Sequence, residues 1–405
     1  MNTDRWFRLI TFAALVGQLF SNGIRIGHNG RMVRAIPDPD GIRTARTLPA
    51  AWYSDGQHHV RELDHAFRAG WVCGGVTDDL PSPGAWCAIR VGAVPVLLVR
   101  DREGVLRAFL NVCRHRGAPL CDDRADRPSG DGALIRCPYH AWLYRLDGSL
   151  ARASGVGAPD DFDLDEHSLT PVGIATWRRM VFVNVGGTAG DLDLGSLAAA
   201  IDAFPIEQLE LVVRERDERA FNWKVLLENF SENYHTPFVH PEIDTTATED
   251  YPMVSDGPVL YAWDRPLRPK DDAQRIMHDL LPGEPGWERL ATASTSRPYD
   301  VGSYLTVWPN LMMNVFPDAV LVMWMEPVSV NVTLVERRMY LRAGTPTGVA
   351  ERIIATHRLV HQQDVDICTS IQRSHDAGLD ADGRLATFEE RGVYFVHQHL
   401  RRALA

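Results

Sequence analysis

The sequence predicts an α+β protein in which a small all-β domain precedes an antiparallel sheet and one long helix. Three observations support this prediction. Short β-branched segments bounded by Pro and Gly fill residues 70–187, as expected of a compact all-β unit. Further strand-like segments follow at 304–308, 311–316, 320–325 and 333–341. Residues 349–373 then contain no Pro or Gly and favour a single long helix.

Composition excludes several classes of protein. With 405 residues, 45% of them hydrophobic and 23% charged, the chain has the make-up of an ordinary globular protein of two or three domains. A net charge of −11 argues against a nucleic-acid partner. Six cysteines are too few for a disulfide scaffold at this length, which favours a cytoplasmic protein that uses metal. The apolar run at 9–20 is shorter than the roughly 20 residues that span a bilayer, so we expect no membrane association.

The chain divides into four parts. Residues 1–45 differ from the rest, and we interpret them as an N-terminal extension that is disordered or translated from a start upstream of the true one. Residues 46–69 are expected to form a helical segment that packs on the second domain. The small β domain occupies 70–187 and the second domain 188–405.

Local patterns place the remaining elements. In the small domain, strands are predicted at 86–91, 95–100 and 180–185. Residues 192–209 favour a helix and 210–221 a strand, whereas 263–297, rich in Pro, Asp and Gly, are expected to form a long surface excursion.

The most specific signal is a pair of Cys/His motifs in the small domain. Cys113-Arg-His115 is followed by Cys137-Pro-Tyr-His140, and each pair lies in a turn-rich segment. Two thiolates and two imidazoles suit either a tetrahedral zinc ion or a [2Fe–2S] cluster in which one iron carries both histidines. The spacing alone leaves both metals open.

A second candidate site lies in residues 222–242. Asn222 is a predicted N-cap for a helix on which Glu232 and His235 share one face. Pro237 is expected to break this helix, so that His235 and His240 converge. With a carboxylate from elsewhere, two such histidines form the facial triad of non-heme Fe(II). The alternative is two hydrogen-bonded histidines in a helix–loop corner.

The long helix offers the missing carboxylate. Asp364 has apolar neighbours at helical spacing, namely Val360, Ile367, Cys368 and Ile371, whereas Asp366 has polar ones. A carboxylate on a buried face needs a partner or a metal, which makes Asp364 the third predicted ligand. The alternative is a buried aspartate paired with an arginine.

These motifs carry a family resemblance. Cys-Arg-His-Arg-Gly-Ala-Pro-Leu and Cys-Pro-Tyr-His-Ala-Trp resemble the Rieske motif of aromatic-ring-hydroxylating oxygenase α subunits. Asn-Trp-Lys…Glu-Asn-Phe-Ser-Glu-Asn-Tyr-His…His-Pro-Glu resembles the mononuclear-iron motif of the same family, and the likeness extends over 48–373. The chain departs from the family in an enlarged loop at 122–132, in Ala141 where Gly is usual, and in Asn233 where Cys is frequent.

The resemblance implies both cofactors and a helix-grip catalytic domain. A Rieske [2Fe–2S] cluster would be held by Cys113, His115, Cys137 and His140. A mononuclear Fe(II) would be held by His235, His240 and Asp364, and the family pattern around the last of these agrees with the periodicity.

The resemblance also implies the terminal oxygenase of a multicomponent system. The chain has no Gly-rich dinucleotide fingerprint, so electrons from NAD(P)H must come through a separate reductase or ferredoxin. In this family they pass between neighbouring subunits of a homotrimer through an acidic residue, here Glu232. A Glu at that position resembles the branch without a β subunit, which includes enzymes that act on quaternary amines and aromatic acids.

The substrate and the number of oxygen atoms inserted stay open at this point. O2-dependent monohydroxylation, dihydroxylation and oxidative dealkylation of a small aromatic or quaternary-amine substrate all fit. An aromatic pocket is one interpretation, and ordinary core packing the other, for Trp263, Tyr304, Trp308, Phe316 and Trp324.

Two functions of other classes also fit the motifs. One is a zinc protein with a structural Cys2His2 site and a hydrolytic His2Asp site. The other is a Rieske electron carrier whose second domain only binds.

Overall fold

The computed structural model describes residues 41–122, 129–157, 159, 161–187, 189–195, 198, 206–241, 253–263, 303–316 and 319–405. The expected surface excursion at 263–297 therefore lies outside the described residues except for Trp263. Of the expected extension, only 41–45 is described. There Gly41–Thr44 forms a 3-10 turn, and Ile42 is buried in the main hydrophobic core.

The smaller unit consists of three antiparallel sheets. One has the order β4-β3-β2-β5, a second β6-β7-β8 and a third β1-β10-β9. Their bounds are β1 Val72–Val76, β2 Ala85–Val91, β3 Val94–Arg100, β4 Leu106–Leu110, β5 Ser129–Asp131, β6 Leu134–Arg136, β7 Leu143–Arg145, β8 Leu150–Arg152, β9 Gly173–Trp177 and β10 Met180–Asn184. The strands predicted at 86–91, 95–100 and 180–185 are confirmed as β2, β3 and β10.

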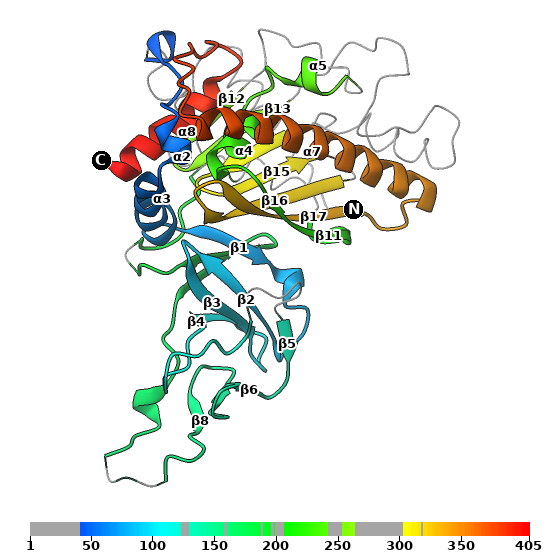
Figure 1. Cartoon of the computed structure of the whole chain (residues 1–405). Helices are drawn as coiled ribbons and strands as arrows, with labels where there is room; N and C mark the ends of the chain where they lie inside the picture. Colours follow the sequence, from blue (N-terminus) through cyan, green and yellow to red (C-terminus); the bar gives the residue numbers. More distant parts are fainter. Residues whose placement is uncertain are drawn as a thin grey trace.

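The larger unit is a seven-stranded antiparallel sheet in the order β11-β17-β16-β15-β14-β13-β12. Its strands are β11 Leu209–Arg219, β12 Met253–Asp256, β13 Val259–Trp263, β14 Ser303–Val307, β15 Leu311–Val315, β16 Ala319–Ser329 and β17 Val332–Arg342. Helix α7, Thr347–Asp376, lies along one face of this sheet (Figure 1). The α+β fold and the predicted long helix are therefore confirmed.

The two faces of the large sheet have different neighbours. On one face, Leu321 and Met339 pack against Val349 and Ile353 of α7. On the other face, strands β14 to β17 pack against β1 and β10 of the smaller unit through one shared hydrophobic cluster. Figure 1 shows the consequence, since α7 and the hairpin strands β6 and β8 lie at opposite ends of the molecule.

Polar contacts fix the smaller unit to the sheet. The Tyr340 hydroxyl on β17 donates to the Asp78 carboxylate at 3.1 Å, and Asp79 is 3.1 Å from Arg338, also on β17. The Asn310 amide donates to the Cys73 carbonyl at 2.9 Å and accepts from the Cys73 N–H at 3.0 Å. Buried hydrogen bonds of this kind hold β1 in a defined position on the sheet.

Helices from both ends of the chain join behind α4, Trp223–Phe230. They are α2 Ala51–Ser54, α3 Gly56–Glu62 with a π-helical turn at Leu63–Arg68, and α8 Arg391–Leu404. Glu62 and Lys224, both 0% exposed, form an ion pair at 2.7 Å. Because removing one partner of a buried pair leaves an uncompensated charge, this contact ties α3 firmly to α4.

The helix predicted at 192–209 was partly wrong. Residues 192–195 are not helical, because Gly195 has a left-handed φ of 66° and its N–H donates to the Asp193 side chain at 2.8 Å. A single 3-10 turn, Ile206–Gln208, leads directly into β11. Most of the intervening residues lie outside the described part of the chain. Among the helices that the structure describes, none has the length and apolarity to cross a membrane.

Candidate metal centres

The corner between α4 and α5, Thr236–Val239, differs from the sequence prediction. Asn222 caps α4 as predicted, accepting from the Lys224 N–H at 3.1 Å. However, α4 ends at Phe230, and Pro237 lies in the first turn of α5, where its missing N–H costs no hydrogen bond. The predictions that Glu232 shares a helix with His235, and that Pro237 breaks that helix, were therefore wrong.

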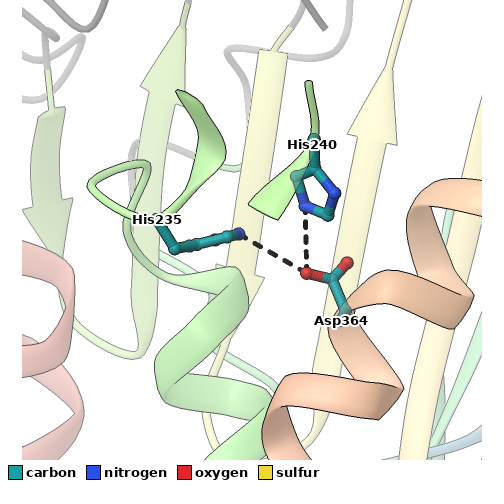
Figure 2. Close-up of side chains that lie close together, drawn as sticks. All are labelled: His235, His240 and Asp364. Atoms are coloured by element: carbon teal, nitrogen blue, oxygen red, sulfur yellow. Dashed lines mark ion pairs between the residues drawn. The ribbon is translucent and has the colours of Figure 1, made fainter. Parts of the chain in front are cut away.

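His235 and His240 nevertheless converge. They flank the single turn of α5 as its N-cap and C-cap residues, and their ring centroids are 5.2 Å apart. Asp364, from the middle of α7, completes the group (Figure 2). Its Oδ1 lies 3.1 Å from His240 Nε2 and 3.4 Å from His235 Nε2.

The outer nitrogen of each imidazole has its own acceptor. Glu232 Oε1 lies 2.5 Å from His235 Nδ1, and Gln363 Oε1 lies 2.8 Å from His240 Nδ1. Both oxygens are acceptors, so each Nδ1 carries a hydrogen, and in the neutral form each imidazole directs its Nε2 lone pair at Asp364. Gln363 was not among the predicted site residues, because its contact with His240 depends on the packing of α5 on α7.

This arrangement fits a divalent cation. Two imidazole lone pairs and a carboxylate oxygen face one another, and they repel unless a proton or cation lies between them. Burial lowers the pKa of His235, but Asp364 and Glu232 outweigh it and raise that pKa to about 9. Asp364 Oδ1 is buried and meets neither histidine at hydrogen-bond geometry. Two histidines and one carboxylate are the facial set that holds Fe(II).

Asp364 lies where it was predicted, but for a partly different reason. The buried stripe of α7 consists of Val349, Ile353, His357, His361, Val365, Cys368 and Gln372. Ile367 and Ile371, which supported the prediction, are 36% and 40% exposed. Asp364 lies at the edge of the buried stripe, 18% exposed, while Asp366 is exposed and accepts from Gln362 at 2.7 Å.

The second candidate centre lies in the loops of the smaller unit. Cys113 and Cys137 are each 2% exposed, and Tyr144 places its hydroxyl 3.2 Å from Cys113 Sγ. The same hydroxyl accepts from the Arg114 N–H at 3.0 Å. It can therefore donate its own hydrogen to a thiolate at Cys113.

The two histidines of these loops form a separate pair nearer the surface. Their ring centroids are 4.8 Å apart, and His115 stacks on Trp142 at an interplanar angle of 11°. His140 Nδ1 is buried without a hydrogen-bond partner, as expected of a ligand atom.

The arrangement in pairs distinguishes a two-iron cluster from zinc. A single tetrahedral zinc would draw all four ligand atoms close together. In the described part of the chain, only His235, His240 and Asp364 bring three ligand atoms within 4.8 Å of one another. A buried cysteine pair and an outer histidine pair instead match a [2Fe–2S] cluster with one iron for each pair.

Ala141 occupies a strained position in the second loop. Its φ of 58° lies in the left-handed region, and its N–H donates to the Cys137 carbonyl at 3.1 Å. A residue with a Cβ pays about 1–2 kcal/mol there, which explains why Gly is usual at this place in the motif.

Comparisons with known proteins agree with both centres. Residues 70–163 match the Rieske [2Fe-2S] domain, and residues 206–405 match the ring hydroxylating alpha subunit (catalytic domain). The chloroplastic choline monooxygenase of Spinacia oleracea is 26% identical over 370 residues, 89% of this chain and 79% of that protein. The carnitine monooxygenase oxygenase subunit of Escherichia coli strain K12 is 27% identical over 380 residues, 88% of this chain and 93% of that protein.

A solved structure is similar over nearly the whole fold. The crystal structure of a quaternary ammonium Rieske monooxygenase bound to an inhibitor has a TM-score of 0.75 and 26% identity to this chain. The match covers 91% of this chain and 99% of that one. Together with the geometry, these likenesses support a Rieske cluster and a mononuclear iron over the two-site zinc alternative.

The first prediction concerns the loop ligands. Cys113→Ser or His140→Ala should abolish the visible absorption of the cluster and all turnover, because each removes one ligand atom. Visible spectroscopy and iron analysis of the purified variants test this. Normal cluster absorption in both variants would mean that the ligands are assigned wrongly.

The second prediction compares two aspartates of α7. Asp364→Ala should lower Fe(II) affinity by about 100-fold or more, since even lost partners of ligands cost 10–100-fold. The cluster absorption should stay unchanged. Asp366→Ala is the matched control, because its carboxylate is exposed, and it should bind iron normally. Iron titration against a chelator measures both, and the reverse order would refute the assignment.

Proposed function

The chain belongs to the Rieske non-heme iron oxygenase α-subunit family, and we propose that it oxidises a small quaternary ammonium compound. It is a terminal oxygenase component, which uses O2 and electrons from a separate donor. The observation that carries the proposal is the His235–His240–Asp364 triad in a chain whose relatives are named for choline and carnitine.

We assign the ligands residue by residue. The cluster is held by Cys113, His115, Cys137 and His140, and the mononuclear Fe(II) by His235, His240 and Asp364. When bound, the two cofactors supply one-electron transfer and activation of O2, which side chains alone do not provide. The protein contributes by holding the ligand side chains in position. Glu232 and Gln363 fix the two imidazoles, and Tyr144 supports the Cys113 thiolate.

We further propose that the active enzyme is a homotrimer. Within one chain, α7 with the triad and the strands that carry the cluster loops lie on opposite sides of the large sheet (Figure 1). Exposed aromatic side chains border both sites, and we call them the aromatic rims. Beside the triad, Tyr234 is 50% exposed and Phe238 is 79% exposed. Beside His140, Tyr139 is 56% exposed. A head-to-tail ring would bury these rims and bring the cluster loops of one subunit to Glu232 of the next.

Only some of the five aromatic residues considered in the sequence analysis lie where they could contact a cationic substrate. Tyr304 and Phe316 lie on the α7 side of the sheet with ring centroids 6.0 Å apart. Trp308 packs against Trp223 in the core, and Trp324 lies on the other face under Arg338. The side chain of Trp263 lies outside the described residues. Two of the five predicted aromatics therefore remain candidates for contact with an ammonium group.

A cytoplasmic location also stays a prediction. None of the six cysteines forms a disulfide in the structure, which suits a reducing compartment. The electron donor would then be a separate cytoplasmic reductase or ferredoxin.

The third prediction tests the substrate class. With a reductase and NAD(P)H, the holoenzyme should consume O2 when choline, glycine betaine or carnitine is added. An aromatic hydrocarbon such as naphthalene should give only the background rate. Oxygen uptake with product analysis measures this. Turnover of naphthalene, with no response to any quaternary ammonium compound, would refute the proposed substrate class.

The fourth prediction concerns Glu232. An amide retains the shape of the side chain but cannot accept from two imidazole N–H groups with a full negative charge. We therefore expect Glu232→Gln to keep both metals and the oligomer, while steady-state turnover falls by orders of magnitude.

The diagnostic measurement is single-turnover oxidation of the reduced cluster with substrate and O2 present. It should slow in proportion to steady-state turnover. Cluster oxidation at the wild-type rate would remove Glu232 from the electron path, and lost iron would make it a structural residue.

A further inference from the structure

The three-stranded sheet β6-β7-β8 forms one wall of the cluster site. Its inner residues Ile135, Tyr144 and Leu150 are buried, and they pack in one hydrophobic cluster with Cys113 and Cys137. The Tyr144 hydroxyl lies 3.2 Å from Cys113 Sγ. The loop that joins β6 to β7 begins at Cys137 and is itself the second cluster loop. The inner face of this sheet therefore contacts the cluster ligands directly.

The outer face of the same sheet carries three arginines. Strand residues alternate between the two faces, so the neighbours of the buried residues point outward. Arg136, Leu143 and Arg152 are paired in register and form one row across the three strands. Leu134 and Arg145 form a second row. All three arginines are exposed, and Leu134 between them is 39% exposed. We call these five residues the arginine face.

The positive charge of the arginine face is not neutralised by the described part of the chain. Neither Arg136 nor Arg152 forms an ion pair with a described carboxylate. Asp147, in the turn between β7 and β8, accepts instead from the N–H and the hydroxyl of Ser149 at 2.9 and 2.7 Å. The whole chain has a net charge of −11, so this face has the opposite sign to the protein that carries it. Such a face attracts an acidic surface.

We propose that the arginine face is the docking surface for an acidic electron donor protein with an iron–sulfur centre. Stacked β layers are about 10 Å apart, so a protein seated on this face lies about that far from the layer that contains Cys113 and Cys137. One electron passes from the reduced donor centre to the oxidised Rieske centre, and no bond forms or breaks. The inference rests on the ligand assignment of the proposed function, and it adds the surface that the donor uses.

The test is titration calorimetry of the purified holoenzyme with an oxidised plant-type [2Fe–2S] ferredoxin, an acidic protein of the donor class. For the wild type, Kd should rise steeply with ionic strength, because salt screens surface charges. Arg136→Glu/Arg152→Glu should raise Kd by about tenfold or more at low salt, since it places like charges opposite each other. Reduction of the cluster by pre-reduced ferredoxin, followed by stopped-flow absorbance, should slow by a similar factor. The ferredoxin has the lower potential, so this transfer is favourable.

Arg401→Glu/Arg402→Glu is the matched control. Both arginines are exposed on α8, which lies at the other end of the molecule from β6 and β8 (Figure 1). The control changes the net charge by the same amount, but Kd should stay within about threefold of wild type, because distant charges are screened. Arg136→Gln/Arg152→Gln removes the two charges without reversing them and should reduce the salt dependence of Kd. This milder variant carries the test if the charge-reversed one loses its cluster absorption.

Several results would overturn the inference. They are wild-type affinity in the charge-reversed variant, an equal loss in the α8 control, an unchanged salt dependence in the Gln variant, and a wild-type protein that does not bind the ferredoxin. Loss of the oligomer in the charge-reversed variant, measured by size-exclusion chromatography, would make the arginine face a subunit interface instead. A wild-type protein without cluster absorption would contradict the ligand assignment of the proposed function, so the two failures are distinguishable.

Discussion

The packing of α4 on α7 is the constraint on which the mononuclear centre depends. His235 and His240 follow α4, while Asp364 comes from α7, more than a hundred residues later. The two helices are joined by a hydrogen bond from the Asn222 N–H to the Gln372 side chain at 2.9 Å, in the buried interior. Behind α4, the Lys224–Glu62 pair adds a contact whose disruption typically costs about 3–5 kcal/mol. The ligands therefore converge because these buried contacts hold α4 against α7 and α3.

The large sheet imposes the second constraint, because it separates the two centres of one chain. Its α7 face carries the triad, and its other face carries the smaller unit with the cluster loops. The Asp79–Arg338 ion pair and the hydrogen bond from Tyr340 to Asp78 join that unit to the sheet. In the homotrimer that we propose, electrons would pass to the iron site of a neighbouring subunit, and Glu232, which accepts from His235, is the side chain that we propose for that path.

Local sequence was sufficient where the chemistry is local. The Cys/His loops, the strands and the long helix follow from spacing and periodicity, as does the N-cap at Asn222.

The remaining features of the site depend on long-range packing, which local sequence does not predict. Glu232 contacts His235, as helical spacing predicted. However, α4 ends before both residues, so the contact is made by non-helical backbone. Asp364 was chosen partly from Ile367 and Ile371, which are exposed. Gln363 stayed unrecognised, because its partner His240 comes from another element. Strands β12 and β13 and helix α8 were also missed.

The central claim is that the cluster of one subunit serves the iron of another. Mixed oligomers test it most directly. Subunits carrying Cys113→Ser and subunits carrying Asp364→Ala are co-expressed with different affinity tags, and oligomers that carry both tags are isolated. Each parent oligomer should be inactive. In a head-to-tail trimer every mixed ring contains one junction between an intact cluster and an intact iron site, so turnover should recover to roughly one third of wild type. Mixed oligomers that retain cluster and iron yet stay inactive would contradict the account.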